Sequence, residues 1–518
     1  MTGTGIRTDR LRTLESVVWI GAIAVLAFAL VAAGIQAARW LPSALEAGAH
    51  HLGIAARIGA IVVAAVASLG VGLWLSARGR WRLAVAVAIV ALVAVRLLAI
   101  AVLPSPITSD WAGYLDLANR LLDGQGFWSA RPPGFPLALA AALALGGPAP
   151  ISGELLNLGV SVAGGLLIAR LVAPAFGRTA ALLGLFCYAL LPEAALWTLI
   201  LGVETLYAAV LVGLAVLAVA ALRAGRHGAL LAVGLGAGFG LEQYVKPSSQ
   251  ILLPALLALP LLAGLPWRRL ATVVVAAVLG FAVVVAPILA WNAQANDRLS
   301  ISPYLYDGWI LFAGLSIAHD GQLSDQDQAD VWIATGLSSD GSAPSEVTNG
   351  TSPFDPRVLA DQRRFNDTAG AMGIQRLETE GAQLIPLAVR KAAILWTRAD
   401  QPVTWIFGGS STARQRAART LLQELSQLGW VVVLFGAVAG ATLVLRRTRI
   451  GGPGAPRPAE ATAILLLVVG TAAIHLLAQV NPRFHEYLLP LLCGLAGIGM
   501  VELGRLVVGR RSVPVAVA

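Results

Sequence analysis

Uninterrupted apolar stretches constrain the fold of this chain more than any other feature. Crossing the hydrocarbon core of a bilayer takes a helix of about 20 apolar residues, and such stretches recur along most of the sequence. Hydrophobic residues make up 57% of the 518 residues and charged residues only 13%, which excludes a soluble domain. We therefore predict an all-α polytopic membrane protein with about 12 transmembrane helices, at residues 16–37, 54–76, 82–103, 151–171, 179–198, 203–222, 228–245, 249–265, 270–291, 428–446, 460–479 and 486–508.

The apolar segment 134–147 is too short for a full crossing, so we predict a re-entrant or interfacial helix there. Arginines in short loops favour the cytoplasmic side of a membrane. We therefore predict that both termini are cytoplasmic, because this orientation places the arginines of the short loops together on the cytoplasmic side. These arginines are Arg78, Arg80, Arg82, Arg170, Arg178, Arg223, Arg226, Arg268, Arg269, Arg446, Arg447, Arg449, Arg510 and Arg511.

The composition indicates a bacterial inner membrane protein. Arginine supplies nearly all of the positive charge, since Lys246 and Lys391 are the only lysines, and Ala, Gly and Val are abundant. The net charge of +9 fits loops that face an anionic leaflet, and a nucleic-acid partner is not predicted. The two cysteines, Cys187 and Cys493, both fall in apolar runs and form neither a disulfide framework nor a metal cluster. No cofactor motif is present, and a divalent metal is left open.

The topology divides the chain into three parts. Residues 1–291 form an N-terminal transmembrane module that includes an outer loop at 104–133. Residues 292–427 form one large extracytoplasmic loop domain, and residues 428–518 form the C-terminal transmembrane helices.

The outer loop carries the charged residues that indicate chemistry. A helix is predicted to begin near Asp110 and end near Gly124, with its apolar side chains on one face along the membrane surface. Arg131 follows one loop later, before the rigid pair Pro132 and Pro133. A carboxylate and a guanidinium held together at a membrane surface suit chemistry on a lipid-linked anionic substrate. The alternative is that Asp110 only stabilises the helix N-terminus.

Several short motifs in order give the chain a resemblance to a known superfamily. The pattern Asp-x-x-x-Tyr at Asp110 and Tyr114, followed by Arg-Pro-Pro-Gly-Phe-Pro from Arg131, resembles the GT-C membrane glycosyltransferases. The nearest likeness is to the protein O-mannosyltransferase and lipid A aminoarabinose transferase group. The motifs that continue the likeness are Phe176-Gly177-Arg178, Pro192 with Glu204-Thr205-Leu206, Lys246-Pro247, and Asn481-Pro482-Arg483-Phe484-His485-Glu486-Tyr487.

The sequence also departs from the pattern of this group. Two additional spans precede the outer loop, and the usual pair of adjacent acidic residues is reduced to Asp110 alone. Arg131 stands where many members have lysine.

The resemblance implies a GT-C architecture, with outer juxtamembrane helices, and an activity. A sugar would move from a polyprenyl phosphate to a hydroxyl of a cell-envelope glycan, lipid or protein, on the extracytoplasmic side and with inversion. Asp110 would be the catalytic base. Cations would stabilise the leaving phosphate. The residues expected to bind the donor phosphate or sugar are Tyr114, Arg131, Glu204, Lys246, Arg483 and His485.

Other interpretations remain open at this point. A purely structural role is also consistent with the positions of Glu204, Lys246 and Arg483, whose side chains would reach from a span to the membrane interface. His485 would then cap a span. A transporter or flippase of lipid-linked sugars would require ionisable residues near mid-membrane and an internal repeat. A non-catalytic membrane assembly factor would tolerate loss of the Asp110 carboxylate.

Overall fold

The computed structural model describes residues 3–125, 131–295, 298–302, 306–344, 356–409, 412–450 and 457–507. Every regular element in these ranges is a helix, which confirms the predicted all-α membrane protein. Residues 126–130 of the predicted outer loop, and the tail with Arg510 and Arg511, lie outside the described residues.

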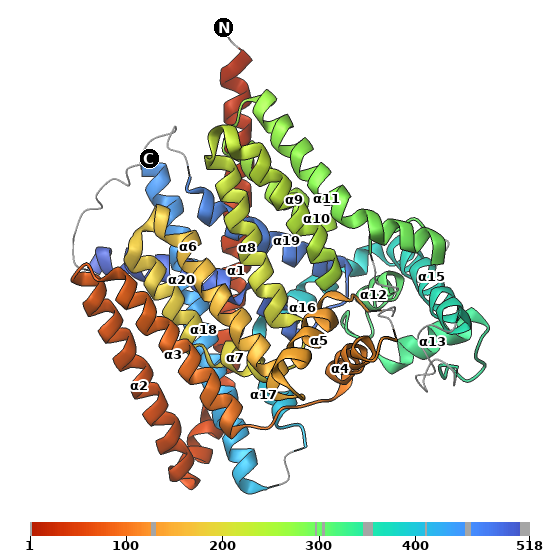
Figure 1. Cartoon of the computed structure of the whole chain (residues 1–518), viewed down its shortest axis with the longest axis horizontal. Coiled ribbons are helices and arrows are strands. Elements are labelled where there is room, and N and C mark those ends of the chain that lie inside the picture. Colours follow the sequence, from red (N-terminus) through yellow and green to blue (C-terminus); the bar gives the residue numbers. More distant parts are fainter. Residues whose placement is uncertain are drawn as a thin grey trace.

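Most of the described residues belong to a bundle of long apolar helices (Figure 1). Its largest hydrophobic core joins residues from α1, α6, α8, α18, α19 and α20. The bundle helices are α1 (Gly3–His50), α2 (Leu52–Ala77), α3 (Trp81–Val102), α6 (Ile151–Leu190), α8 (Glu204–Arg223), α9 (Gly228–Val245), α10 (Ser249–Leu262), α11 (Trp267–Ala295), α18 (Ala413–Ile450), α19 (Ala459–Leu477) and α20 (Leu489–Val507).

The described residues contain nine helices long and apolar enough to cross a membrane, so the expected count of about 12 is not confirmed. The expected span 151–171 and the larger part of the expected span 179–198 both belong to the single helix α6. Two others, at 228–245 and 249–265, become α9 and α10, which are not among the nine. Helix α9 contains Glu242 and Gln243, and α10 has only 14 residues.

Helix α6 is folded back on itself at Gly177. The backbone there has φ 84° and ψ 166°, which a helix cannot contain and which glycine adopts without strain. The two halves then lie side by side, because a Cβ built on Gly165 would approach the Leu185 side chain to 2.8 Å. The motif Phe176-Gly177-Arg178 is therefore a tight turn between two antiparallel segments.

Two short helices lie between α3 and α6. Helix α4 (Ser109–Leu122) matches the amphipathic helix predicted from Asp110, with Trp111 and Ala118 fully buried on its apolar face. Helix α5 (Gly134–Gly146) has 13 residues, or about 20 Å, which is too short to cross a bilayer. It packs against α4, α6 and α9.

The region between α11 and α18 divides into two parts. Helices α12 (Asp307–Gly314), α13 (Asp325–Thr335) and α15 (Pro356–Thr379) lie beside the bundle (Figure 1) and share a small core around Trp309, Trp332 and Phe365. Helices α16 (Leu384–Thr397) and α17 (Gln401–Ile406) pack into the bundle, because Trp396 and Val403 belong to its core.

Hydrogen bonds attach α12 and the segment that follows it to the end of α19. Gln479 N donates to Ile310 O at 3.0 Å, and Val480 N donates to Gly321 O at 2.8 Å. Lys391 Nζ donates to the carbonyl oxygens of both Gly314 and Leu476, at 2.6 and 2.9 Å. Helix α12 is thereby held against the membrane part of the protein, where it forms one wall of a cavity.

Candidate functional site

A cavity of about 360 Å³ lies where the ends of several bundle helices meet α4 and α12. Its size is in the range of small-molecule sites, and its lining combines apolar side chains with convergent polar and charged groups. The polar and charged residues that line it are Asp110, Tyr114, Arg131, Glu204, Tyr207, Lys246, Ser248, Gln250, Asp307, Thr471, His475, Gln479, Arg483 and Tyr487.

Asp110 is held between two arginines. Arg131 Nη1 donates to Asp110 Oδ1 at 2.8 Å, and Arg483 Nη2 donates to Asp110 Oδ2 at 2.9 Å. The Arg483 pair joins residues 373 positions apart in the sequence. Each carboxylate oxygen of Asp110 thus accepts from a different guanidinium.

The two guanidinium charges control the protonation of Asp110. Burial alone would raise the pKa of this carboxyl, but the charges of Arg483 and Arg131 outweigh burial and lower the pKa to about 2. Asp110 is therefore an anion at any physiological pH. Proton transfer works best for a base whose pKa lies near the operating pH, so this paired form of Asp110 is a weak base.

Glu204 forms a second ion pair with Arg483, in addition to the pair between Arg483 and Asp110. Its Oε1 lies 3.8 Å from Arg483 Nη1, and the Glu204 side chain is only 4% exposed. Glu204 is the first residue of α8, and Arg483 follows Asn481, whose side chain caps the 3₁₀ turn η4 (Pro482–Leu488). Arg483 is thus fixed between two carboxylates that come from different parts of the chain.

Arg131 packs against the N-terminal half of α4. Its guanidinium carbon lies 5.4 Å from the centre of the Tyr114 ring. Gly113 makes room for it, because a Cβ at Gly113 would meet the guanidinium at 3.4 Å. Burial and the nearby Glu204 charge raise the pKa of Tyr114 to about 12, so its phenol remains neutral.

Lys246 supplies a third cation inside the cavity. Its Nζ donates to Tyr487 OH at 2.5 Å and lies 4.5 Å from the centres of the Phe484 and Tyr487 rings. Enclosure in the cavity and the charge of Arg483 lower the pKa of Lys246 to about 8. The amine is therefore mostly protonated at neutral pH and loses its charge in mild base.

A polar network supports the backbone beside Lys246. The Ser248 hydroxyl donates to Glu242 Oε1 at 2.5 Å and also contacts the Tyr207 hydroxyl. The Ser248 backbone N–H donates to the same Glu242 oxygen at 3.2 Å. Glu242 is not among the cavity-lining residues, so its contribution is to position Ser248 and the Lys246–Pro247 step.

Of the residues predicted to form the site, six line the cavity and His485 does not. His485 is fully buried, with Nε2 2.9 Å from Glu193 Oε1 and Nδ1 3.0 Å from Leu395 O. Its ring stacks on Trp430. Both ring nitrogens are therefore engaged in the interior, which removes His485 from the candidate phosphate-binding residues.

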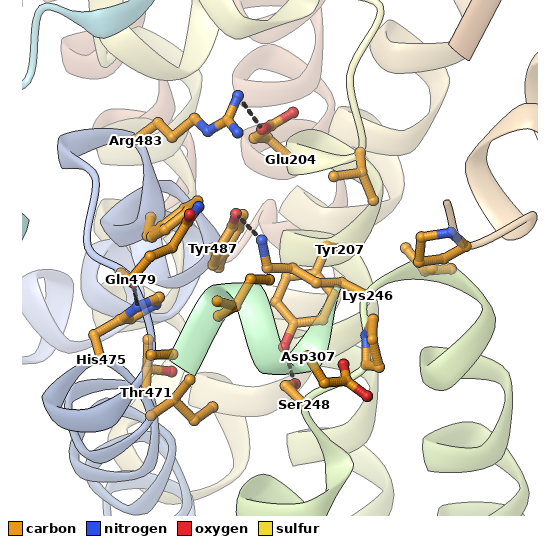
Figure 2. Close-up of a pocket in the computed structure, with 18 of the residues that line it drawn as sticks. Glu204, Tyr207, Lys246, Ser248, Asp307, Thr471, His475, Gln479, Arg483 and Tyr487 are labelled. Carbon is orange, nitrogen blue, oxygen red and sulfur yellow. Dashed lines mark hydrogen bonds and ion pairs between the residues drawn. The ribbon is translucent and has the colours of Figure 1, made fainter. Parts of the chain in front are cut away.

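The cavity also contains residues that the sequence did not single out (Figure 2). Tyr487 ends the motif that begins at Asn481, and Ser248 closely follows Lys246, so the sequence motifs could have indicated both residues. Thr471 and Gln479 carry no such signal, because one lies inside an apolar span and the other just beyond its end. Within the described ranges, no group of three or more His, Cys, Asp or Glu side chains is placed to hold a metal ion.

Comparison with known proteins gives one family match. Residues 130–291 match the model described as dolichyl-phosphate-mannose-protein mannosyltransferase. The match includes Arg131, Glu204 and Lys246 and ends before Arg483. It confirms the resemblance to GT-C membrane glycosyltransferases of the mannosyltransferase group. A search of curated protein sequences gave no match.

The similar solved structures include two that share low sequence identity with this chain. One is the archaeal oligosaccharyltransferase AglB from Archaeoglobus fulgidus in complex with an inhibitory peptide and a dolichol-phosphate (TM-score 0.48, 15% identity). The alignment covers 85% of this chain and 53% of AglB, so the chain spans about half the length of that protein. The other is ArnT from Cupriavidus metallidurans bound to undecaprenyl phosphate (TM-score 0.40, 16% identity, 82% of this chain and 78% of ArnT).

Proposed function

We propose that this multi-pass membrane protein is a glycosyltransferase that moves a sugar from a polyprenyl phosphate to an acceptor hydroxyl, at the extracytoplasmic end of its helices. The observation that carries the proposal is the pairing of Asp110 with Arg131 and Arg483 in a cavity that also holds Lys246. Such a site combines a candidate base with fixed cations for a leaving phosphate. The match of residues 130–291 to a mannosyltransferase family supports the same reaction class.

Donor binding would release Asp110 from its pairs. A phosphate needs the same guanidinium groups that now hold the Asp110 oxygens, at 2.8 and 2.9 Å. When Arg131 and Arg483 turn to the phosphate, burial is left as the main influence on the carboxyl and raises its pKa. Asp110 then becomes a stronger base only when a donor is present.

The transfer step follows from this arrangement. The acceptor hydroxyl oxygen bonds to the anomeric carbon on the face opposite the phosphate, and Asp110 takes the hydroxyl proton. The bond from that carbon to the phosphate oxygen breaks, and the polyprenyl phosphate leaves with the electron pair. The cations Arg131, Arg483 and Lys246 stabilise the charge that develops on it. The sugar configuration is inverted.

The test is transfer by purified protein from a polyprenyl-phosphate-linked sugar, with donor binding measured in parallel. We expect Arg131→Ala to weaken binding or transfer by about ten- to a hundred-fold, the loss of about 1.5–3 kcal/mol expected for a hydrogen bond to a charged group. Arg131→Lys keeps the charge but not the planar fork and should fall between wild type and Arg131→Ala. Equal activity of wild type and Arg131→Ala would contradict the proposed role of Arg131.

The lowered pKa of Lys246 predicts that donor binding depends on pH. Its pKa is lowered to about 8, so its charge is present below that pH and is lost as the pH rises through it. A sugar-linked phosphate diester keeps one negative charge over this range, so we expect its affinity to fall by about ten-fold between about pH 7 and 9. Lys246→Arg stays charged and should remove this fall. Persistence of the fall in Lys246→Arg would assign it to another group.

The proposed orientation of the protein in the membrane can be tested by cysteine labelling. Arginine placement puts Asp123 and Ser342 outside and Arg268 inside. All three positions are exposed in the structure. In a variant without Cys187 and Cys493, cysteines at 123 and 342 should react with an impermeant thiol reagent in intact cells, and a cysteine at 268 should not. Labelling at position 268 would reverse the proposed orientation.

A further inference from the structure

Thr471 and Gln479 present buried side-chain oxygens to the cavity. Thr471 is 3% exposed and Gln479 is 9% exposed, and both line the cavity. Within the described part of the chain, neither Thr471 Oγ1 nor Gln479 Oε1 has a hydrogen-bond partner. Buried polar groups in folded proteins are normally satisfied, so unsatisfied groups that line a cavity point to a polar ligand.

A neighbouring histidine presents a third acceptor. His475 Nδ1 lies 2.8 Å from the backbone oxygen of Gln479, and because a carbonyl can only accept, Nδ1 must carry the proton. The other ring nitrogen, Nε2, is then an acceptor. The ring is held by stacking on Phe484, with centroids 4.7 Å apart.

These acceptors lie away from the paired arginine. Figure 2 shows Thr471 and His475 at the opposite end of the view from Arg483 and Glu204, with Gln479, Lys246 and Tyr487 between them. A group attached to a phosphate at Arg483 and Lys246 would reach Thr471 by extending past Gln479 and Tyr487. A hydrocarbon chain there would leave the oxygens of Thr471 and Gln479 unsatisfied, whereas sugar hydroxyls would donate to them.

This end of the cavity also presents a carboxylate. Asp307 lines the same cavity, lies 3.7 Å from Arg298 and accepts from the Ser302 hydroxyl at 3.3 Å. In Figure 2 it lies in the lower part of the view, as Thr471 and His475 do. A sugar that carries a carboxylate would bring a second negative charge close to Asp307, while hydroxyl groups would find acceptors.

We propose that Thr471, His475 and Gln479 form a subsite for hydroxyl groups of the transferred sugar, and that this subsite together with Asp307 selects a neutral sugar over a carboxylated one. The inference rests on the proposed function, because it takes the phosphate of the donor to lie at Arg131, Arg483 and Lys246. It adds the class of sugar to that function.

The test compares three probes on the purified full-length protein: undecaprenyl phosphate, undecaprenyl-phosphate mannose and undecaprenyl-phosphate glucuronate. Thr471→Val removes a hydroxyl with little change in shape, and Gln479→Met removes an amide. We expect each to weaken binding of the mannose lipid by about three- to ten-fold, the range for one lost hydrogen bond, and to leave undecaprenyl phosphate unchanged. Wild type should bind the mannose lipid more tightly than the glucuronate lipid, and Asp307→Asn should reduce that preference.

Thr198→Val is the matched control. Thr198 is fully buried and its hydroxyl is also unpartnered, but it does not line the cavity, so no change in the binding of any probe is expected. An equal effect of Thr198→Val and Thr471→Val would overturn the subsite, as would unchanged binding of the mannose lipid by both Thr471→Val and Gln479→Met.

The remaining outcomes separate the two proposals. If Thr471→Val and Gln479→Met weaken undecaprenyl phosphate as much as the mannose lipid, these residues contact the lipid and the sugar subsite is wrong while donor binding stands. Equal affinity of wild type for the mannose and glucuronate lipids would overturn the selection of neutral sugars. If wild type binds none of the three probes, the proposed function itself fails.

Discussion

Asp110→Asn should abolish sugar transfer without loss of donor binding. Asparagine has the size of aspartate and can still accept a hydrogen bond, but it cannot take up the acceptor's proton. Loss of a general base typically reduces the rate by about 10²- to 10⁴-fold. Arg131 and Arg483 lose their carboxylate partner in this variant, so we expect affinity for a phosphate lipid to be maintained or increased.

Single-turnover transfer and equilibrium binding of the same donor distinguish the outcomes. Lost transfer with retained binding supports Asp110 as the base. Loss of binding as well would make Asp110 a structural residue that positions the two arginines. Full transfer by Asp110→Asn would exclude the proposed mechanism and favour a transporter of lipid-linked sugars or an assembly factor.

Arg483→Met should be the most destabilising change in the cavity. It removes a donor contact and also leaves Glu204, which is 4% exposed, without a positive partner. Breaking a buried ion pair by removing one partner costs about 3–5 kcal/mol. We therefore expect a clear drop in the temperature of unfolding in detergent, together with loss of donor binding.

A second substitution separates these two effects. In the double variant Arg483→Met, Glu204→Gln the unpaired carboxylate is gone, so stability should recover while donor binding stays lost. If stability does not recover, packing rather than charge explains the effect of Arg483→Met. If donor binding recovers with it, Arg483 does not contact the phosphate.

Local features of the site were predictable from the sequence. The helix over 109–122 follows from amphipathic spacing and from the stop at Gly124, which has φ 71° in the structure. The pairing of Asp110 with Arg131 was anticipated because one short loop separates them. Short-range geometry limits the possible arrangements in both cases.

Long-range geometry was not predictable. Arg483 was singled out from its motif, but nothing in the sequence indicates that it shares Asp110 with Arg131. His485 is two residues away in the same 3₁₀ turn, where three residues complete a turn, so its side chain points to a different side and into the protein interior. Thr471 and Gln479 can be recognised as cavity residues only from the structure, which places the end of α19 beside the cavity.

The ion pairs in the cavity also limit which anions can bind there. Asp110 and Glu204 already offset the charges of Arg131 and Arg483, so an incoming phosphate replaces an existing partner and gains little electrostatic energy. Inorganic phosphate and soluble sugar phosphates, which are abundant in water, should therefore compete poorly. A ligand with a long hydrocarbon chain brings additional binding energy from the bilayer. Near-neutrality of the cavity thus favours membrane-borne donors over dissolved ones.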